Sequence, residues 1–114
     1  MRSLREDVIA MGVDYEINLR PIRSGFDGET CWVHARAGAI PGAGEGDLPA
    51  IVMTMQKLLL TGSDVFYTIN DMRSDDMGES WSDPATQEGL ARWDAGDGVT
   101  GGICDFTPAW HAET

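Results

Sequence analysis

Four side chains in this 114-residue chain carry the sulfur and imidazole donors that can bind zinc: Cys31, His34, Cys104 and His111. Cys31 and His34 have the spacing of one half of a zinc site. Six residues separate Cys104 from His111, which is too long for the usual second half. Structural cysteines and histidines are therefore the favoured interpretation, and the sequence predicts neither a metal site nor another cofactor. Two cysteines are also too few for a disulfide framework.

A second group of residues has the chemistry of a tight turn. It matches the Asp-box pattern Ser-x-Asp-x-Gly-x-(Ser/Thr)-Trp, with Ser74, Asp76, Gly78, Ser80 and Trp81 at the fixed positions. The carboxylate of Asp76 can accept hydrogen bonds from backbone N–H groups two or three residues ahead, and Gly78 supplies the positive φ of a reversal. The two serines can bond across the turn, and the tryptophan ring can pack it against a sheet. The pattern predicts a β-hairpin in which these residues are structural and not catalytic.

Charge limits the partners of the chain. It has 19 Asp and Glu against 8 Lys and Arg, for a formal net charge of −11. Such a protein repels phosphate backbones and anionic bilayers, so no nucleic-acid or membrane partner is predicted. An anionic sugar stays possible because a few arginines can bind a carboxylate locally. The larger aromatic residues could stack on sugar rings or pack in a core, and the sequence leaves both open for Trp32, Trp93, Phe106 and Trp110.

Targeting signals are not evident in the chain. No apolar run is long enough to cross a bilayer, so no transmembrane segment is predicted. Acidic residues stand near the N-terminus where a signal peptide has its apolar core, so no signal peptide is predicted either. The localisation is left unassigned.

The elements that position these residues are predicted to be short strands. Ser3 and Glu6 would cap a short helix through Met11. Residues 57–60 could extend a strand or begin a helix, and residues 38–49, with four glycines and two prolines, form the longest predicted loop. A return strand would begin at Trp81 after the turn. The remaining strands are predicted at residues 15–19, 30–36, 50–56, 65–70 and 101–106.

The order of these features resembles the first blade of the sialidase (bacterial neuraminidase repeat) superfamily. Arg36 precedes Ile40-Pro41-Gly42, and an apolar strand and then the Asp-box follow. The resemblance covers roughly residues 31–84, with a looser continuation over residues 104–111. It implies an all-β fold of antiparallel blades from a six-bladed β-propeller.

The length of the chain limits how much of a propeller it can form. A blade needs about 40 to 50 residues and a closed ring at least about four blades, so the propeller is predicted to be incomplete in this chain. Residues 1–29 would be a lead-in with a strand and a helix, and residues 30–84 the first blade with its Asp-box. Residues 85–114 would be a linker and the start of a second blade.

The resemblance implies a retaining exo-α-sialidase that acts on terminal sialic acids of glycans. The family clamps the substrate carboxylate with three arginines, because a guanidinium matches a carboxylate bidentately, and uses an acid/base aspartate and a tyrosine nucleophile. Arg36 matches the first clamp arginine, with three residues inserted before Ile40-Pro41. Asp64 lies near the place of the acid/base aspartate, and the alternative for it is a turn aspartate that caps a strand.

Two functions stay open at this stage. One is the N-terminal part of a sialidase-like glycoside hydrolase, itself inactive because the tyrosine and the third arginine would come from later blades. The other is a non-catalytic Asp-box propeller module that binds glycans or proteins. Gln56-Lys57 stands where the family usually has an arginine, which favours the second. The predicted partners are a carbohydrate and the remaining blades of the parent chain.

Overall fold

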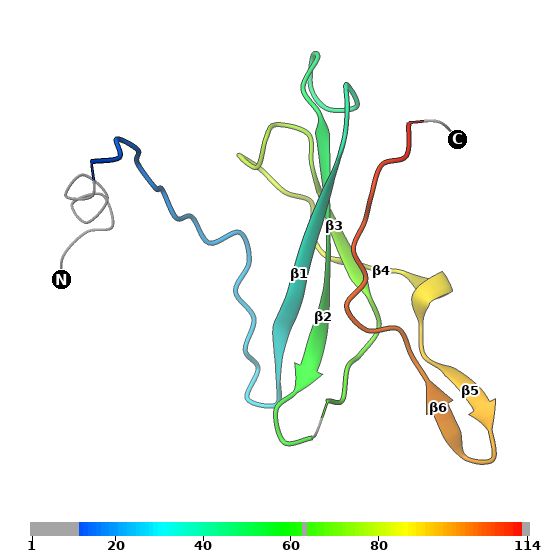
Figure 1. Ribbon diagram of the computed structural model, residues 1–114. Coiled ribbons are helices and arrows are strands. Elements are labelled where there is room, and N and C mark those ends of the chain that lie inside the picture. The colour runs from blue at the N-terminus through cyan, green and yellow to red at the C-terminus, as the bar shows by residue number, and fades with distance from the viewer. Residues whose placement is uncertain (1–11, 63, 113–114) are drawn as a thin grey trace.

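The computed structural model describes residues 12–62 and 64–112 and shows an all-β protein. One antiparallel sheet has the order β1-β2-β3-β4, with β1 at Thr30–Ile40, β2 at Ala50–Leu59, β3 at Asn70–Ser74 and β4 at Ala85–Thr86 (Figure 1). A 3-10 helix at Glu88–Leu90 leads to a separate two-stranded antiparallel sheet of β5, Trp93–Gly96, and β6, Val99–Gly101. The predicted all-β, antiparallel fold class is confirmed.

The two longest strands, β1 and β2, contain the predicted strands at residues 30–36 and 50–56. β1 continues to Ile40 and β2 to Leu59, so residues 57–59 extend the strand and do not begin a helix. The loop predicted at residues 38–49 is therefore shorter, and begins only after β1 ends. A register shift between Val33 and Arg36 marks a β-bulge in β1. His34, inside this bulge, has a φ of 56°.

The prediction of a strand at residues 65–70 is wrong, because only Asn70 of this segment lies in a strand. Phe66 makes an isolated bridge to Leu58, and β3 begins only at Asn70. Between these points the side chain of Gln56 donates from Nε2 to the carbonyl of Tyr67 at 3.0 Å. This side-chain bond satisfies a carbonyl that a regular ladder would have paired with backbone, as happens where one strand bulges away from another.

Three other predicted elements also differ from the structure. Residues 15–19 form no strand, and all five are exposed. The return strand after Trp81 begins only at Ala85 and has two residues. β6 ends at Gly101, so residues 102–106 lack the predicted strand. The helix predicted at residues 3–11 lies outside the described residues.

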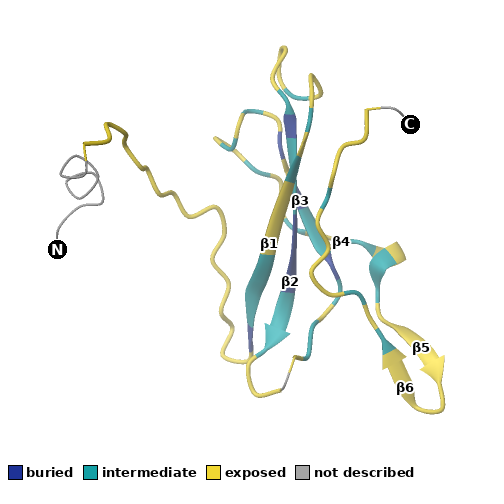
Figure 2. Cartoon of the chain, viewed as in Figure 1, coloured by how far each residue is buried: buried dark blue, intermediate teal, exposed yellow. Residues whose placement is uncertain are grey.

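The core is small for a chain of this mass. The buried apolar side chains among the described residues are Ala50, Met55, Ile69 and Met72. They lie in the sheet and its border, while β5 and most of β6 are exposed (Figure 2). The accessible surface of 8207 Å² exceeds the roughly 6,100 Å² expected of a compact protein of 12.4 kDa. The radius of gyration of 18.0 Å likewise exceeds the roughly 13 Å expected of a compact domain of this length.

The two faces of the main sheet are covered by different ends of the chain. Side chains alternate along β2, so Met53, Met55 and Lys57 lie on one face and Thr54 and Gln56 on the other. The N-terminal arm, residues 12–25, reaches the methionine face at Arg20, Ile22 and Arg23, and the C-terminal segment, residues 102–109, runs along the opposite face (Figure 1). We call these the methionine face and the glutamine face.

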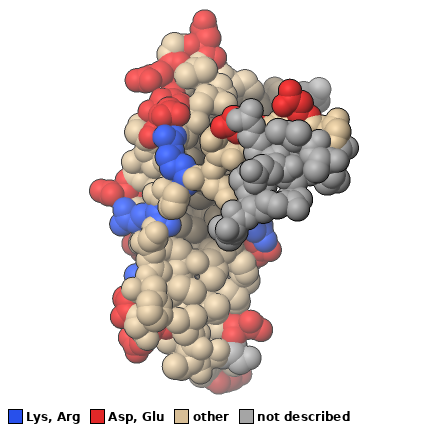
Figure 3. Space-filling model, turned by 90° about the vertical axis from the view of Figure 1, so that its left-hand side faces the viewer, with Lys and Arg blue, Asp and Glu red and all other residues tan. Residues whose placement is uncertain are grey.

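Acidic side chains dominate the surface. In the view of Figure 3, Asp and Glu lie around the edge of the molecule, with few Lys and Arg between them. None of the helices in the described part of the chain is long and apolar enough to span a membrane.

Candidate functional site

The Asp-box forms the connection between β3 and β4, and its bonds are local. Asp76 accepts hydrogen bonds through Oδ1 from the Ser74 hydroxyl at 2.9 Å and from the Ser80 N–H at 2.8 Å, and through Oδ2 from the Ser80 hydroxyl. The N–H of Gly78 donates to the Ser74 hydroxyl oxygen at 2.8 Å. The Trp81 indole N–H donates to the carbonyl of Gly78 at 3.2 Å. All five fixed residues of the pattern thus take part in one continuous hydrogen-bond network.

The backbone and the charge of this turn follow from that network. Gly78 has a φ of 87°, in the left-handed region that glycine adopts without strain. Hydrogen bonds from the Ser80 hydroxyl and N–H to the Asp76 carboxylate lower the pKa of Asp76 to about 2, because they favour its ionised form. Asp76 therefore has its acceptor sites turned inward to the hairpin.

Arg36 projects from β1 on the glutamine face. Its register partner is Thr54, and its Nη2 forms an ion pair with Asp105 Oδ1 at 2.9 Å. Its Nη1 donates to the backbone carbonyl of Ala35 at 3.2 Å. The side chain is 43% exposed, so the guanidinium is accessible to solvent while it is held by one carboxylate.

Asp64 lies in the loop that leaves β2. It has a φ of 53° and is exposed. It lines a cavity of about 250 Å³ together with Phe66, Arg92, Thr100 and Cys104. Arg36 does not line this cavity. It lies nearby, because its partner Asp105 follows Cys104, which lines the cavity together with Asp64.

Gln56 has the most bonded side chain on the glutamine face, and sequence reasoning missed its role. It is fully buried, and its Nε2 donates to the carbonyls of Tyr67 at 3.0 Å and Ile103 at 2.6 Å. Its Oε1 accepts from the N–H of Asp105 at 2.9 Å. The neighbouring Thr54 hydroxyl donates to the carbonyl of Phe106 at 2.6 Å. These bonds join β2 to the C-terminal segment, which comes so close to β1 that a Cβ at Gly38 would lie 2.4 Å from the Pro108 carbonyl oxygen.

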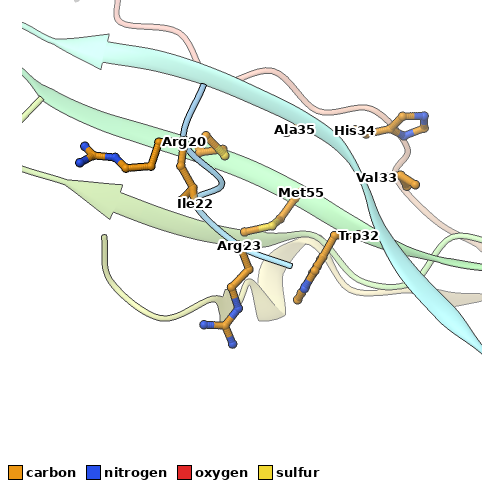
Figure 4. A pocket seen from close by; sticks show the side chains of 9 residues that line it. Arg20, Ile22, Arg23, Trp32, Val33, His34, Ala35 and Met55 are labelled. Carbon is orange, nitrogen blue, oxygen red and sulfur yellow. The ribbon is translucent and has the colours of Figure 1, made fainter. Parts of the chain in front are cut away.

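The methionine face is lined by cavities, whereas side-chain hydrogen bonds hold the C-terminal segment on the glutamine face. A cavity of about 440 Å³ lies between the N-terminal arm and the sheet, lined by Ile22, Trp32, Met53 and Met55 among others. Figure 4 shows the guanidinium groups of Arg20 and Arg23 extending outward from the arm. A cavity of about 490 Å³ shares Trp32 and Arg23 with the first one.

Polar and aromatic groups line this second cavity. Tyr67 and Asn70 contribute to its wall, as does Lys57, whose ammonium lies 5.4 Å from the Trp32 ring centroid. Of the four aromatic residues that could stack on sugar rings, Trp32 lines both of these cavities, whereas Trp93, Phe106 and Trp110 are exposed. Aromatic, cationic and amide groups together are suited to a sugar ring.

The cysteine and histidine side chains do not pair as their spacing in the sequence suggests. His34 Nδ1 lies 3.8 Å from the Sγ of Cys104, and not against Cys31. Neither cysteine forms a disulfide. Across the described residues, no three metal-binding side chains gather at one point.

The chain matches no protein-family model, and searches of the curated proteins and of the solved structures return no significant match.

Proposed function

We propose that this chain forms the first-blade portion of a sialidase-like glycoside hydrolase that acts on terminal sugars of glycans, and that the chain is inactive by itself. The supporting observation is the sheet of β1 to β4. It is a four-stranded antiparallel meander with strands in sequence order, and its Asp-box connects the third and fourth strands. Propeller blades are four-stranded sheets of this kind arranged around a central channel.

The surface of the sheet supports the same proposal. A blade buries its two faces against its neighbours, so a lone blade leaves apolar side chains and cavities uncovered. The methionine face has such cavities, and the accessible surface is larger than that of a compact domain. Further blades would cover this face.

Arg36 would bind the carboxylate of the sugar. Its guanidinium is already held by the carboxylate of Asp105, and it is partly exposed on β1. A ligand carboxylate of the same geometry would replace Asp105 with little loss of hydrogen bonding. In this proposal Asp105 stays paired with the Arg36 guanidinium until the sugar carboxylate takes its place.

The binding step can be tested by titration with N-acetylneuraminic acid, observing the Arg36 Nε–H by NMR. We expect a saturable shift with the acid and none with its carboxyl methyl ester, which removes the charge. Arg36→Met should abolish the response. Arg73→Met is the matched control, because it removes another arginine that is paired with a carboxylate, Asp75 at 2.7 Å, and it should leave the Arg36 response unchanged. Equal responses to acid and ester would refute the role of Arg36.

Catalysis is tested separately with a fluorogenic sialoside. The 114-residue chain should give no turnover, because its residues supply neither the tyrosine nor the full arginine clamp that the resemblance implies. Turnover that Arg36→Ala abolishes would contradict this part of the proposal.

The second candidate is a non-catalytic Asp-box module that binds glycans or proteins. It is favoured by the cavity that Trp32, Tyr67 and Asn70 line. A neutral oligosaccharide should then quench tryptophan fluorescence, and Trp32→Phe should remove the effect while Trp93→Phe should not. Quenching without any response of Arg36 to the sugar acid would favour this candidate over the hydrolase.

A further inference from the structure

Cys104 and His34 form a pair that neither proposed function uses. We propose that Cys104 is a reactive thiol, activated by His34, and that it is the site at which small neutral electrophiles modify this protein. Thiolates are the nucleophilic form of cysteine, and an adjacent imidazole is a group that takes the thiol proton. The 3.8 Å between Sγ and Nδ1 places the two atoms in contact across 70 positions of sequence.

The sulfur is positioned by bonds on both sides of Cys104. Gln56 donates to the carbonyl of Ile103 and accepts from the N–H of Asp105, the two residues that flank the cysteine. Asp105 is also paired with Arg36 at 2.9 Å. Gln56 is fully buried, so its end of these bonds is shielded from water. Cys104 therefore has a defined position although its own side chain is exposed.

The imidazole is positioned as specifically as the sulfur. His34 has a φ of 56°, a conformation uncommon for residues other than glycine, and it lies in the bulge of β1. Bulges redirect side chains at functional positions, and backbone outliers that persist are held by their surroundings. Here the ring of Phe66 stacks on the His34 ring with centroids 4.9 Å apart. The stack and the bulge together direct Nδ1 toward Cys104.

A reagent can reach the sulfur through the cavity of about 250 Å³ that Cys104 lines. The charged groups near the pair are Arg92 and Asp64, which line this cavity, and Arg36 and Asp105, which pair with each other. Each set has one cation and one anion. Their charges offset, so the surroundings favour neither an anionic nor a cationic reagent, and a neutral electrophile is the fitting class.

The reaction with iodoacetamide illustrates the chemistry. His34 Nδ1 takes the thiol proton, and the sulfur attacks the methylene carbon of the reagent. The C–S bond forms as the C–I bond breaks, and iodide leaves. No oxidant or second reactant is needed.

The test is the rate of iodoacetamide alkylation at each cysteine, measured by peptide mass spectrometry at pH 7. Cys31 serves as the internal control, because its sulfur has no hydrogen bond among the described residues. We expect Cys104 to react roughly tenfold faster than Cys31 at pH 7. That difference should disappear in urea. Equal rates for the two cysteines in the folded protein would overturn the proposal.

His34→Asn is the decisive variant. Asparagine tolerates a positive φ better than most residues, so it can keep the bulge while it removes the proton acceptor. The Cys104 rate should fall roughly tenfold and the Cys31 rate should not change. His111→Asn, which alters the other histidine, should leave both rates unchanged. An unaltered Cys104 rate in folded His34→Asn, checked by circular dichroism, would also overturn the proposal.

Discussion

The methionine and glutamine faces of the main sheet show two ways of covering the same strands. On the glutamine face, Gln56 and Thr54 hold the C-terminal segment through short hydrogen bonds from buried side chains. On the methionine face, the N-terminal arm is joined to the Asp-box side of the molecule by exposed ion pairs, Arg20 with Glu79 and Arg23 with Asp83.

The difference indicates that the attachment of the C-terminal segment contributes more to the stability of the fold than that of the N-terminal arm. Buried hydrogen bonds are costly to break because the groups left behind cannot return to water, whereas exposed ion pairs lose little when they open. The glutamine face is therefore completed by the chain itself. The methionine face, with its two adjoining cavities, is the one available to another blade.

The largest predicted effect is that of Gln56→Leu. It would leave the carbonyls of Tyr67 and Ile103 and the N–H of Asp105 without partners, and should lower the free energy of unfolding by about 3 kcal/mol. Urea denaturation measures the loss. Met55→Leu on the opposite face is the matched control and should cost less than about 1.5 kcal/mol. A larger loss for Met55→Leu would reverse the ranking of the two faces.

A smaller effect is expected from acid at the Asp-box hairpin, against which the N-terminal arm is held. The pKa of Asp76 is lowered to about 2 in the folded state, so its stabilising contribution is complete above its ordinary pKa near 3.8. As pH falls from about 4 to about 2 the carboxylate protonates and that contribution is lost. NMR of the Ser80 amide should follow this transition.

Asp76→Asn is the control for that titration, because its amide does not titrate. Asp27, whose pKa is lowered by hydrogen bonds from Thr30 and Glu29, adds a second acid-sensitive contribution at the start of β1. Asp76→Asn should therefore still lose some stability in acid, through Asp27. The acid transition in the NMR signal of the Ser80 amide should be absent from this variant. A Ser80 transition that persists in Asp76→Asn would contradict the assignment.

The smallest effect is predicted for the double variant Arg20→Met/Arg23→Met, which removes both ion pairs of the arm. Exposed pairs contribute little, so the free energy of unfolding should change by less than about 1 kcal/mol. The same variant should increase proteolysis within residues 12–25 without affecting residues 102–109. A loss comparable to that of Gln56→Leu would show that the two faces are held equally.

The local elements were the most predictable from sequence. The Asp-box hairpin could be described residue by residue because the hydrogen bonds among its five fixed residues join positions at most four apart, such as Ser80 to Asp76. The succession of short apolar segments likewise predicted an all-β chain and located β1 and β2. Residues 15–19 show the limit of that reasoning, because an alternating pattern forms a strand only where another strand is available to pair with it.

The candidate sites depended much more on tertiary structure. The sequence could name Arg36, Asp64, His34 and Cys104 as residues with suitable chemistry, but it could not say which of them meet.

The sequence by itself determined the turn, the strand class and the acidic surface, because each depends on residue type or on near neighbours. Only the tertiary structure decided that Gln56 is buried, that Arg36 pairs with Asp105 and that His34 faces Cys104. These contacts join positions 47 to 70 residues apart. They form only when the C-terminal segment crosses the glutamine face, and that crossing is a property of the whole fold.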